Sequence, residues 1–417
     1  KGQLLLTVTE GHKPPLLIKA PSGMGKTMLA AALARDEEVR QVFPDGIFWI
    51  GLGKEPPILD DQIALVQNLE GSTMSFVDVE AANEYLRQLC TTHACLVILD
   101  DVWDVQDVLA FNIASEHSQL LITTSDSNLL NITQYFVKNI QGYTLKTFQE
   151  KQAIDFFLRC VDRKEITANT APIKLDDLVT LCNCLPSALK LIASLVRNQS
   201  PTTWPTLLNR LQNEEYEFPT QYPRALMQAL HFNVEALGEQ ADYYLALAVF
   251  SDYSRIPQVT VVMLWRYLYQ LLDDQANNFI KELADKGLLD VKGKLHQRYI
   301  SLHSFQHDYL VAEADLEKLH NHLLAAYRRQ CGQHGWLSGP NDGYFFEYLG
   351  MHLVKAGRKN ELKMLLLDFD WMQKKLQIGT VHGLVHDYEL VEDRDVEVVK
   401  NTLYESVPVL IQNKSEL

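Results

Sequence analysis

The sequence predicts an α/β domain, with helices on both faces of a parallel sheet, followed by three mainly helical regions. In the first third, short apolar runs alternate with segments of helical periodicity. Such strands, separated by helices, indicate a parallel sheet that is buried on both faces. After about residue 143 the helical periodicity continues with few strand signals. Two short extended runs, GLLDVKG and QRYISLH, then follow helices, which is the pattern of a winged-helix unit.

The individual elements follow from these patterns in chain order. The expected strands are the apolar runs at residues 15–20, 46–53, 94–100, 118–125 and 135–140. Helical periodicity marks residues 27–36, 79–90, 147–160, 175–182, 186–196 and 203–212. With a proline-rich boundary at 201–223, we expect an α/β domain at 1–143, a first helical domain at 144–222, a winged-helix domain at 223–311 and a second helical domain at 312–417.

Composition and charge exclude several classes of function. The 417 residues carry a net charge of −15, which disfavours binding to nucleic acid or to an anionic membrane as the main role. No apolar run has the length of a membrane span. The six cysteines show no disulfide framework, so we expect reduced thiols and a cytoplasmic protein. The chain opens on Lys1, and we expect it to be a fragment.

The segment APSGMGKTMLA, residues 20–30, predicts a phosphate-binding loop. It follows an expected strand and opens an expected helix. It matches the pattern G-x-x-x-x-G-K-[ST] except at the first position, which is Ala20. The alternative is a glycine-rich turn with a chance lysine, and the strand–loop–helix context favours the phosphate loop.

Each residue of this loop has a chemical reason. Gly23 and Gly25 let the backbone turn so that amides face the phosphates, next to the positive end of the helix dipole. Lys26 reaches the β- and γ-phosphates and contributes to catalysis, and Thr27 offers a hydroxyl to Mg²⁺. The loop therefore predicts binding of a nucleotide's phosphates with Mg²⁺, in an α/β P-loop NTPase domain.

The apolar run CLVILDDVWD, residues 95–104, ends in acids. In P-loop proteins the strand beside the loop carries an acid that holds Mg²⁺ at its C-terminal edge. We assign that role to Asp100, and we expect Asp101 to orient or deprotonate the attacking water. Taken alone, the pair reads as solvated acids at a strand end, but the upstream phosphate loop favours the functional interpretation.

With this segment and several others along the chain, the sequence resembles the NB-ARC family of STAND signal-transduction ATPases. The matching segments are VFPDGIFWIGLGKE (42–55), LVILDDVWD (96–104), LLITTSD (120–126), CNCLPSALKLIASLV (182–196), RYISLHSFQHDYL (298–310) and GYFFEYLGMHLVKAGRKNELKMLLLDFDWMQKKL (343–376). The last segment favours the apoptosis-factor branch over the plant resistance proteins. The resemblance implies a P-loop domain, a helical domain, a winged helix and a second helical domain.

The resemblance also implies further nucleotide contacts. Met24 lies within the loop, and Met28 stands where a backbone amide meets the α-phosphate. Pro186 matches the proline that packs beside the adenine; otherwise it is a helix-starting proline. His303 matches a histidine that contacts the β-phosphate of ADP from the winged-helix domain. Its neighbour His307, four residues on, is expected to be bystander packing, although an alignment on His307 and Asp308 is an alternative.

Two positions depart from the family pattern. Ser125 stands where the family has an arginine that senses the γ-phosphate, and a serine lacks the long cationic fork. This puts ATP hydrolysis in doubt. Ser304 replaces an aspartate that braces the closed arrangement, so we expect that state to be held less firmly.

These observations leave more than one function open. The first hypothesis is a switch that is closed and monomeric with ADP and oligomerises on exchange to ATP to activate an effector. The resemblance implies an effector domain before residue 1, sensor repeats after residue 417 and self-association through the nucleotide-binding module. The net charge leads us to expect no nucleic acid and no membrane as partner. The alternatives are a degenerate nucleotide-binding scaffold that does not cycle and a winged-helix transcriptional regulator with an ATPase module.

Overall fold

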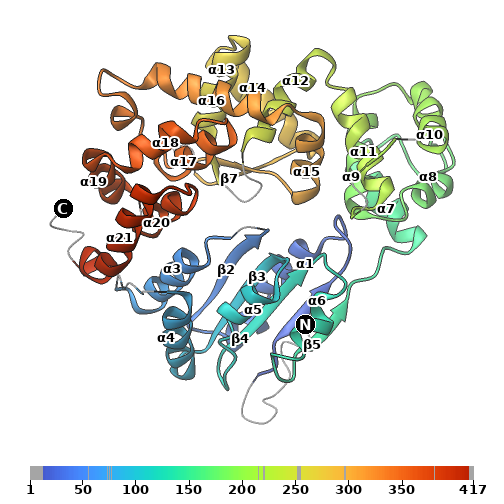
Figure 1. Cartoon of the computed structure of the whole chain (residues 1–417). Coiled ribbons are helices and arrows are strands. Elements are labelled where there is room, and N and C mark those ends of the chain that lie inside the picture. The colour runs from blue at the N-terminus through green and yellow to red at the C-terminus, as the bar shows by residue number, and fades with distance from the viewer. Residues whose placement is uncertain are drawn as a thin grey trace. The chain divides into compact units, whose positions relative to one another are not determined.

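A computed structural model describes residues 13–54, 56–72, 74, 76, 78–214, 216–218, 221–250, 255–294, 297–379 and 381–412 (Figure 1). The chain divides into two compact units. The first comprises the residues up to 238 together with 286–288, and the second comprises 239–285 and 289–417. The first unit holds the α/β domain and the helices that follow it. The finer domain boundaries given above stay predictions.

The first unit contains a five-stranded parallel sheet with the strand order β2-β3-β4-β1-β5. The strands are β1 (Leu16–Lys19), β2 (Gly46–Gly53), β3 (Cys95–Val102), β4 (Gln119–Thr124) and β5 (Gln141–Thr144). The predicted parallel sheet is confirmed. The sequence did not specify the strand order, in which β4 lies between β1 and β3, the strand that carries the acids.

The predicted strand at residues 135–140 was also wrong. This stretch forms turns after a short helix, and the fifth strand begins at Gln141. Val137 is the buried side chain that anchors the turn, while Tyr135 and Phe136 are exposed. The apolar run therefore reflects a single anchor and two exposed aromatic rings and not a buried strand.

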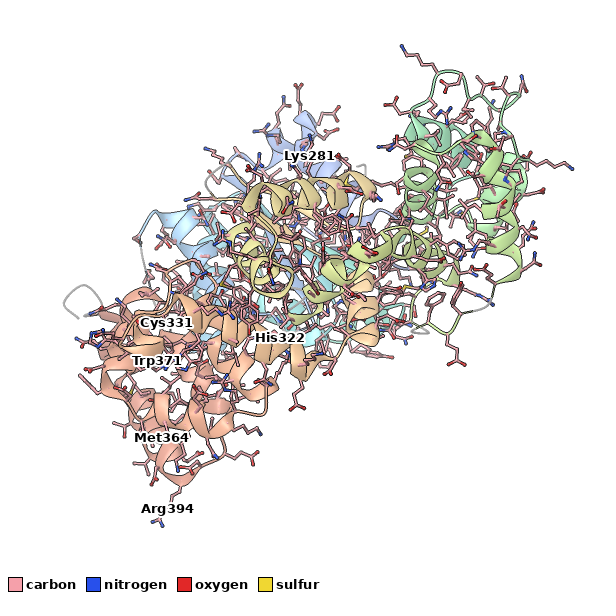
Figure 2. All side chains as sticks on the ribbon, turned by 90° about the horizontal axis from the view of Figure 1, so that it is seen from above. Lys281, His322, Cys331, Met364, Trp371 and Arg394 are labelled. Carbon is pink, nitrogen blue, oxygen red and sulfur yellow. The ribbon has the colours of Figure 1, made fainter. Side chains whose placement is uncertain are left out.

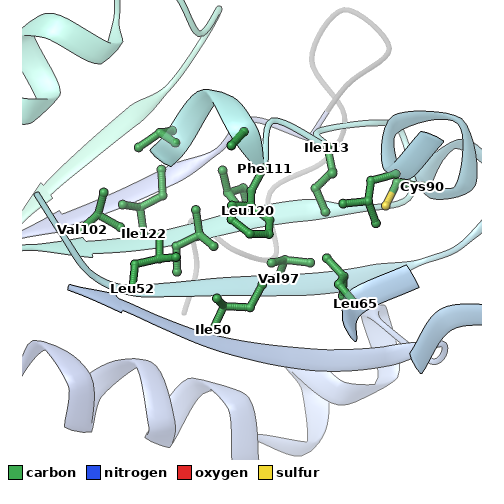
Figure 3. Close-up of a cluster of buried hydrophobic side chains, with 14 of the residues drawn as sticks. Ile50, Leu52, Leu65, Cys90, Val97, Val102, Phe111, Ile113, Leu120 and Ile122 are labelled. Carbon is green, nitrogen blue, oxygen red and sulfur yellow. The ribbon is translucent and has the colours of Figure 1, made fainter. Parts of the chain in front are cut away.

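Helices cover both faces of this sheet (Figure 1). They are α1 (Lys26–Arg35), α2 (Glu37–Val42), α3 (Ile58–Glu70), α4 (Val79–Thr92), α5 (Val105–Ala110) and α6 (Leu129–Thr133). Side chains alternate along each strand, so Leu16 and Ile18 of β1 join the core under α1 and α2, while Leu17 joins the opposite core. Figure 3 shows that second core, with Ile50, Val97 and Ile122 among its side chains. Burial on both faces explains why these strands read as continuous apolar runs.

The rest of the first unit is helical. Its helices are α7 (Glu150–Val161), α8 (Leu175–Leu181), α9 (Pro186–Arg197), α10 (Trp204–Asn213) and α11 (Arg224–Glu235). A buried amide joins two of them, because Asn233 of α11 donates to the carbonyl of Leu191 of α9 at 2.9 Å. The Ser194 hydroxyl donates to the Asn233 side-chain oxygen at 2.8 Å. These bonds hold α11 against α9, whose first turn becomes important below.

The second unit begins with a small antiparallel sheet among helices, as the winged-helix pattern predicts. Its strand order is β6-β8-β7. The strands are β6 (Ile256–Pro257), β7 (Asp290–Lys292) and β8 (Tyr299–Ser301), and the helices around them are α12 (Ala241–Leu245), α13 (Gln258–Tyr269), α14 (Asp273–Lys286) and α15 (Ser304–Glu313).

Helices alone complete the described part of the second unit. They are α16 (Leu316–Gln330), α17 (Phe345–Lys355), α18 (Lys359–Leu366), α19 (Phe369–Ile378), α20 (Val381–Glu389) and α21 (Arg394–Gln412). Trp371, labelled in Figure 2, is fully buried among them and stacks on Phe346 at a ring-centroid distance of 5.6 Å. Among the helices described, none has the length and apolar character needed to cross a bilayer.

Candidate functional site

The candidate phosphate loop connects the end of β1 to the start of α1. Gly25 is the residue before α1 and has a φ of 88°, and Gly23 has a φ of 83°. Both lie in the left-handed region, which side chains with a Cβ rarely adopt. The glycines therefore allow the turn that leaves the first amides of α1 without a side-chain cap. Such amides are a ready site for phosphate oxygens.

Gly23 is also a point of close contact with the helical part of the first unit. Its carbonyl accepts a hydrogen bond from the backbone N–H of Ser187 at 3.1 Å. A Cβ at Gly23 would lie 3.2 Å from the Ser187 Cβ and 3.0 Å from a methyl carbon of Leu226. The phosphate loop thus touches the first turn of α9 and the side of α11. Neither Ser187 nor Leu226 was singled out from the sequence.

Lys26 is 7% exposed and points its ammonium back at the loop. It donates to the carbonyl oxygens of Ala20 at 2.8 Å and Pro21 at 3.3 Å, and to the Ser125 hydroxyl at 2.9 Å. Burial lowers the pKa of Lys26, and the charges of Asp101 and Asp100 oppose that shift. A buried cation with neutral partners gains from an anionic oxygen, so Lys26 suits a phosphate contact.

Asp100 lies at the end of β3 with its carboxylate facing Thr27. The Thr27 hydroxyl donates to Asp100 Oδ1 at 2.9 Å, and the Thr123 hydroxyl donates to the same oxygen at 2.6 Å. Burial raises the pKa of Asp100, while these two hydrogen bonds oppose the rise. The structure therefore brings together the two predicted Mg²⁺ ligands. Thr123 was missed, although a threonine at the end of an apolar strand was a visible signal.

Asp101 holds an unusual backbone conformation. Its φ is 61°, in the left-handed region, and its N–H donates to the Thr123 hydroxyl at 3.0 Å. The Thr123 hydroxyl thus donates to the Asp100 carboxylate and accepts from the backbone N–H of Asp101. A left-handed aspartate near the end of a strand costs about 1 kcal/mol or more, and such outliers gather at functional sites.

Ser125 lies against the loop even though it lacks the family's arginine. Its hydroxyl accepts from Lys26 and lies 3.1 Å from the Ser22 hydroxyl. Ser22, which was also missed, therefore joins the end of β4 to the phosphate loop. The arrangement places a neutral hydroxyl beside Lys26 at the predicted sensor position.

The remaining loop and helix positions differ in exposure. Met24 is buried, whereas the Met28 side chain is 69% exposed, so only its backbone is suited to the contact that the resemblance implies. Pro186 is the first residue of α9 and directly precedes Ser187. Pro186 therefore lies next to the contact between Ser187 and Gly23, a position that suits packing against a bound nucleotide.

His303 belongs to the second unit, whereas the phosphate loop belongs to the first, so His303 is described here by its own surroundings. It is the residue before α15, and its side chain is 54% exposed, with Nε2 3.6 Å from Asp290 Oδ2. Ser304 is the first residue of α15. His307 is half-buried, with Nε2 at 2.6 Å from the carbonyl oxygen of Phe250. The two histidines thus have different environments: one is accessible to a ligand, and the other is engaged in packing.

The residues of the first unit fit a nucleotide and a magnesium ion. A Cβ at Gly25 would meet no atom of the described residues within 4 Å, which leaves space beside the uncapped amides. Thr27 and Asp100 are oxygen ligands, the kind that Mg²⁺ prefers together with phosphate oxygens and water. No cluster of three or more His, Cys, Asp or Glu occurs in the described part of the chain, so a closed all-protein metal cage is not the type of site seen here.

Comparison with known proteins agrees with this geometry. The model of the NB-ARC domain matches residues 4–167, and the model of the APAF-1 helical domain matches residues 316–416. Apoptotic protease-activating factor 1 of Homo sapiens is 26% identical over 430 residues, which cover 96% of this chain and 33% of that protein. The Rattus norvegicus protein is 26% identical over 412 residues, covering 91% and 31%. A probable disease resistance protein of Arabidopsis thaliana is 27% identical over 303 residues, covering 70% and 35%.

The chain thus spans about a third of the length of the curated relatives it matches. Among solved structures, the Aeropyrum pernix ORC1 protein in complex with DNA aligns with 14% identity and a TM-score of 0.30, over 73% of this chain and 87% of that one. A mutant of the Thermotoga maritima RuvB protein aligns with 12% identity and a TM-score of 0.28, over 69% and 85%. Scores this low do not bear on the function of the chain.

The parallel sheet, the phosphate loop and the acid at the end of β3 define a P-loop nucleotide-binding protein. Residues 4–167 match the NB-ARC domain and residues 316–416 match the APAF-1 helical domain, and the chain resembles apoptotic protease-activating factor 1. The resemblance inferred from the sequence is confirmed.

Proposed function

We propose that the chain is the nucleotide-operated switch of a signalling protein. In this proposal it is closed and monomeric with ADP, and it oligomerises on exchange to ATP to activate an effector. The observation that carries the proposal is the contact of the phosphate loop, through Gly23, with Ser187 and Leu226 of the helical part. A ligand on the loop therefore adjoins the helices as well as the sheet, and a ligand shifts a conformational equilibrium only through such differential contacts.

The chemistry of the switch is assigned to the residues already described. The first amides of α1 and Lys26 hold the phosphates, and Pro186 lines the base. Thr27 and Asp100 would hold Mg²⁺, which would supply positive charge to stabilise the phosphates. Asp101 orients water for a slow hydrolysis that resets the switch, and Ser125 occupies the sensor position beside Lys26.

The partners and the location belong to the same proposal. The relatives are about three times longer than this chain, which supports an effector domain before residue 1 and sensor repeats after residue 417. Self-association through the nucleotide-binding module brings effectors together in the cytoplasm. The net charge of −15 supports a switch that uses neither nucleic acid nor a membrane as its partner.

We expect ADP to co-purify with the protein and Lys26→Ala to release it. Removing one side of a charged hydrogen bond costs roughly 2–5 kcal/mol, so the affinity should fall by about 30-fold or more. Chromatography of the denatured protein measures the bound nucleotide. Lys151→Ala, at an exposed lysine of α7, is the matched control and should retain ADP. Wild-type protein without nucleotide, and without measurable affinity for added ADP, would contradict the proposal.

A second candidate function is a scaffold that binds nucleotide and never cycles, and Ser125 favours it. The same preparations decide between the two. ATP hydrolysis by the wild type above the rate of Lys26→Ala supports the switch, whereas equal rates with bound nucleotide support the scaffold. The weakest alternative is a winged-helix transcriptional regulator. A DNA affinity that falls steeply as the salt concentration rises would favour it.

His303→Ala should loosen the closed state. The half-exposed imidazole beside α15 is proposed to contact the β-phosphate, and the loss of such a bond corresponds to roughly tenfold faster release of ADP. Fluorescent ADP measures the release, and light scattering with ATP measures assembly, which should increase. The control is His334→Ala, at an exposed histidine before the short helical turn at 335–338. Unchanged release and unchanged particle size would exclude this role.

A further inference from the structure

A hollow of about 630 Å³ lies within the second unit and is lined by none of the residues assigned to the nucleotide. It is bounded by β6, the first turns of α13, the strand β8, the start of α14 and the end of α16. Cys331, labelled in Figure 2, directly follows α16 and marks that edge. The volume is within the range of ordinary ligand sites, and the side chains around it are largely polar.

Guanidinium groups of three arginines border this hollow. Arg266 forms an ion pair with Asp273. Within the described ranges, Arg255 and Arg298 have no carboxylate within 4.0 Å. Arg255 instead lies 5.7 Å from the centre of the Tyr299 ring. The described residues therefore leave two cations at the hollow without a compensating charge.

The remaining acid at the hollow does not neutralise them. Asp342 Oδ2 accepts from the hydroxyls of Thr260 at 2.9 Å and Tyr327 at 2.8 Å. Its Oδ1 accepts from the backbone N–H groups of Tyr344 at 2.9 Å and Phe345 at 2.8 Å. Four donors thus occupy this carboxylate, and they leave it little capacity for an ion pair with either arginine.

An acceptor at the hollow is also unsatisfied. The Gln258 side-chain nitrogen donates to Asn277 Oδ1, and its backbone N–H donates to the Arg298 carbonyl at 3.0 Å. The Gln258 side-chain oxygen, by contrast, is buried and has no hydrogen-bond partner among the residues that the structure describes. A buried acceptor without a partner costs about 1–3 kcal/mol. A ligand with an N–H donor would remove this cost.

We propose that this hollow binds an acidic peptide segment. The guanidinium groups of Arg255 and Arg298 take a carboxylate or phosphoryl side chain, and a backbone N–H next to that side chain donates to Gln258. Paired arginines are the usual recognition groups for acidic and phosphorylated motifs. A peptide supplies a side-chain anion and a backbone N–H that are held at a fixed spacing along one chain. The site is independent of the nucleotide site proposed above.

Fluorescence anisotropy of the full chain with three labelled peptides tests the proposal. The peptides share one glycine-rich sequence and carry glutamate, phosphoserine or glutamine at the centre. The two anionic peptides should bind, with the stronger one identifying the preferred group, and the glutamine peptide should bind at least about tenfold more weakly. The proposal would be overturned if the anionic peptides bound no more tightly than the glutamine peptide, or if none of the three peptides bound.

Arg298→Gln should weaken binding of the anionic peptides by about tenfold, and Arg255→Gln should do the same. Arg394→Gln is the matched control, because Arg394 is an exposed arginine at the start of α21, outside the hollow (Figure 2). Circular dichroism verifies that the variants are folded. Equal weakening by Arg394→Gln, or displacement of the peptide by inorganic phosphate or ATP at equal concentration, would show that a general anion effect and not a peptide site is responsible.

Discussion

Replacing Lys375 by methionine should destabilise the helices around α19 and α20 by about 3–5 kcal/mol. Lys375 is 0% exposed and its ion-pair partner Asp387 is 2% exposed. Burial raises the pKa of the Asp387 carboxyl, and the charge and hydrogen bond of Lys375 oppose that rise. The substitution leaves a buried carboxylate without its cation, which is why the expected effect is large.

The close packing around this pair limits relaxation. A Cβ at Gly350 of α17 would lie 2.5 Å from Asp387 Oδ1, so the helix backbone already contacts the carboxylate. Asp387 therefore has little space to turn away when its partner is removed. Replacing both members, as Lys375→Met with Asp387→Leu, should recover most of the loss, because an apolar pair leaves no unpaired charge.

Amide hydrogen exchange in α19 and α20 measures this effect locally, without assuming that the two units unfold together. Lys374→Met is the control, since Lys374 is partly exposed and next to Lys375 in the chain. The interpretation would be wrong if Lys375→Met and Lys374→Met changed the exchange by the same amount, or if the double replacement were less stable than the single one.

The second unit should also lose stability in mild acid because of a buried histidine pair. Nδ1 of His320 lies 2.8 Å from Nδ1 of His352, and Nε2 of His352 lies 3.0 Å from the Tyr344 hydroxyl. One ring must donate and the other accept, so at least one of the two rings must be neutral, and protonation of both abolishes the hydrogen bond. Burial, and then the charge of Lys355, lower the pKa of His320 to about 4. Burial lowers the pKa of His352 as well.

The direction of the pH effect follows from these shifts. The unfolded chain takes up protons near the ordinary histidine pKa of about 6.5, before the folded chain does. The stability is therefore complete above that pH and is lost as the pH falls toward 4. For His320 alone the loss reaches roughly 3 kcal/mol, from about 1.4 kcal/mol for each pKa unit.

Thermal melting between about pH 7.5 and 4.5, on either side of the ordinary histidine pKa, measures this loss. His320→Gln, which cannot titrate, should flatten the dependence of the melting temperature on pH, although it lowers the melting temperature at neutral pH. His334→Gln, at an exposed histidine, should leave the slope unchanged. A slope of the same size in wild type and His320→Gln would assign the acid sensitivity to other groups.

Much of the nucleotide site could be predicted from the sequence because its signals are local. The pattern around Lys26 and Thr27 specifies a turn, a helix start and a cation within a few residues. Asp100 was recognisable as an acid after a buried strand. The hydrogen bond from Thr27 to Asp100, between residues 73 positions apart, agrees with both assignments.

The sequence predictions failed where the local apolar pattern did not match the burial of the side chains in the structure. The run at 135–140 has four apolar residues among six, yet both of its aromatic rings are exposed and the strand begins at Gln141. Thr123 and Ser22 lie inside the matched segments at 120–126 and 20–30, but the patterns read from the sequence gave neither residue a role. They acquire a role only because β4 lies between β1 and β3, which sequence periodicity does not specify.

The sequence by itself determined the phosphate loop, the buried strands and the NB-ARC resemblance, because backbone turns and apolar alternation depend on neighbouring residues. Only the tertiary structure decided which side chains meet. It put Ser125 on Lys26, 99 positions away, and Gly23 against Ser187. The physical reason is that strand order and helix packing set the distances between elements. The energies of hydrogen bonds and buried ion pairs change strongly when those distances change by about an ångström.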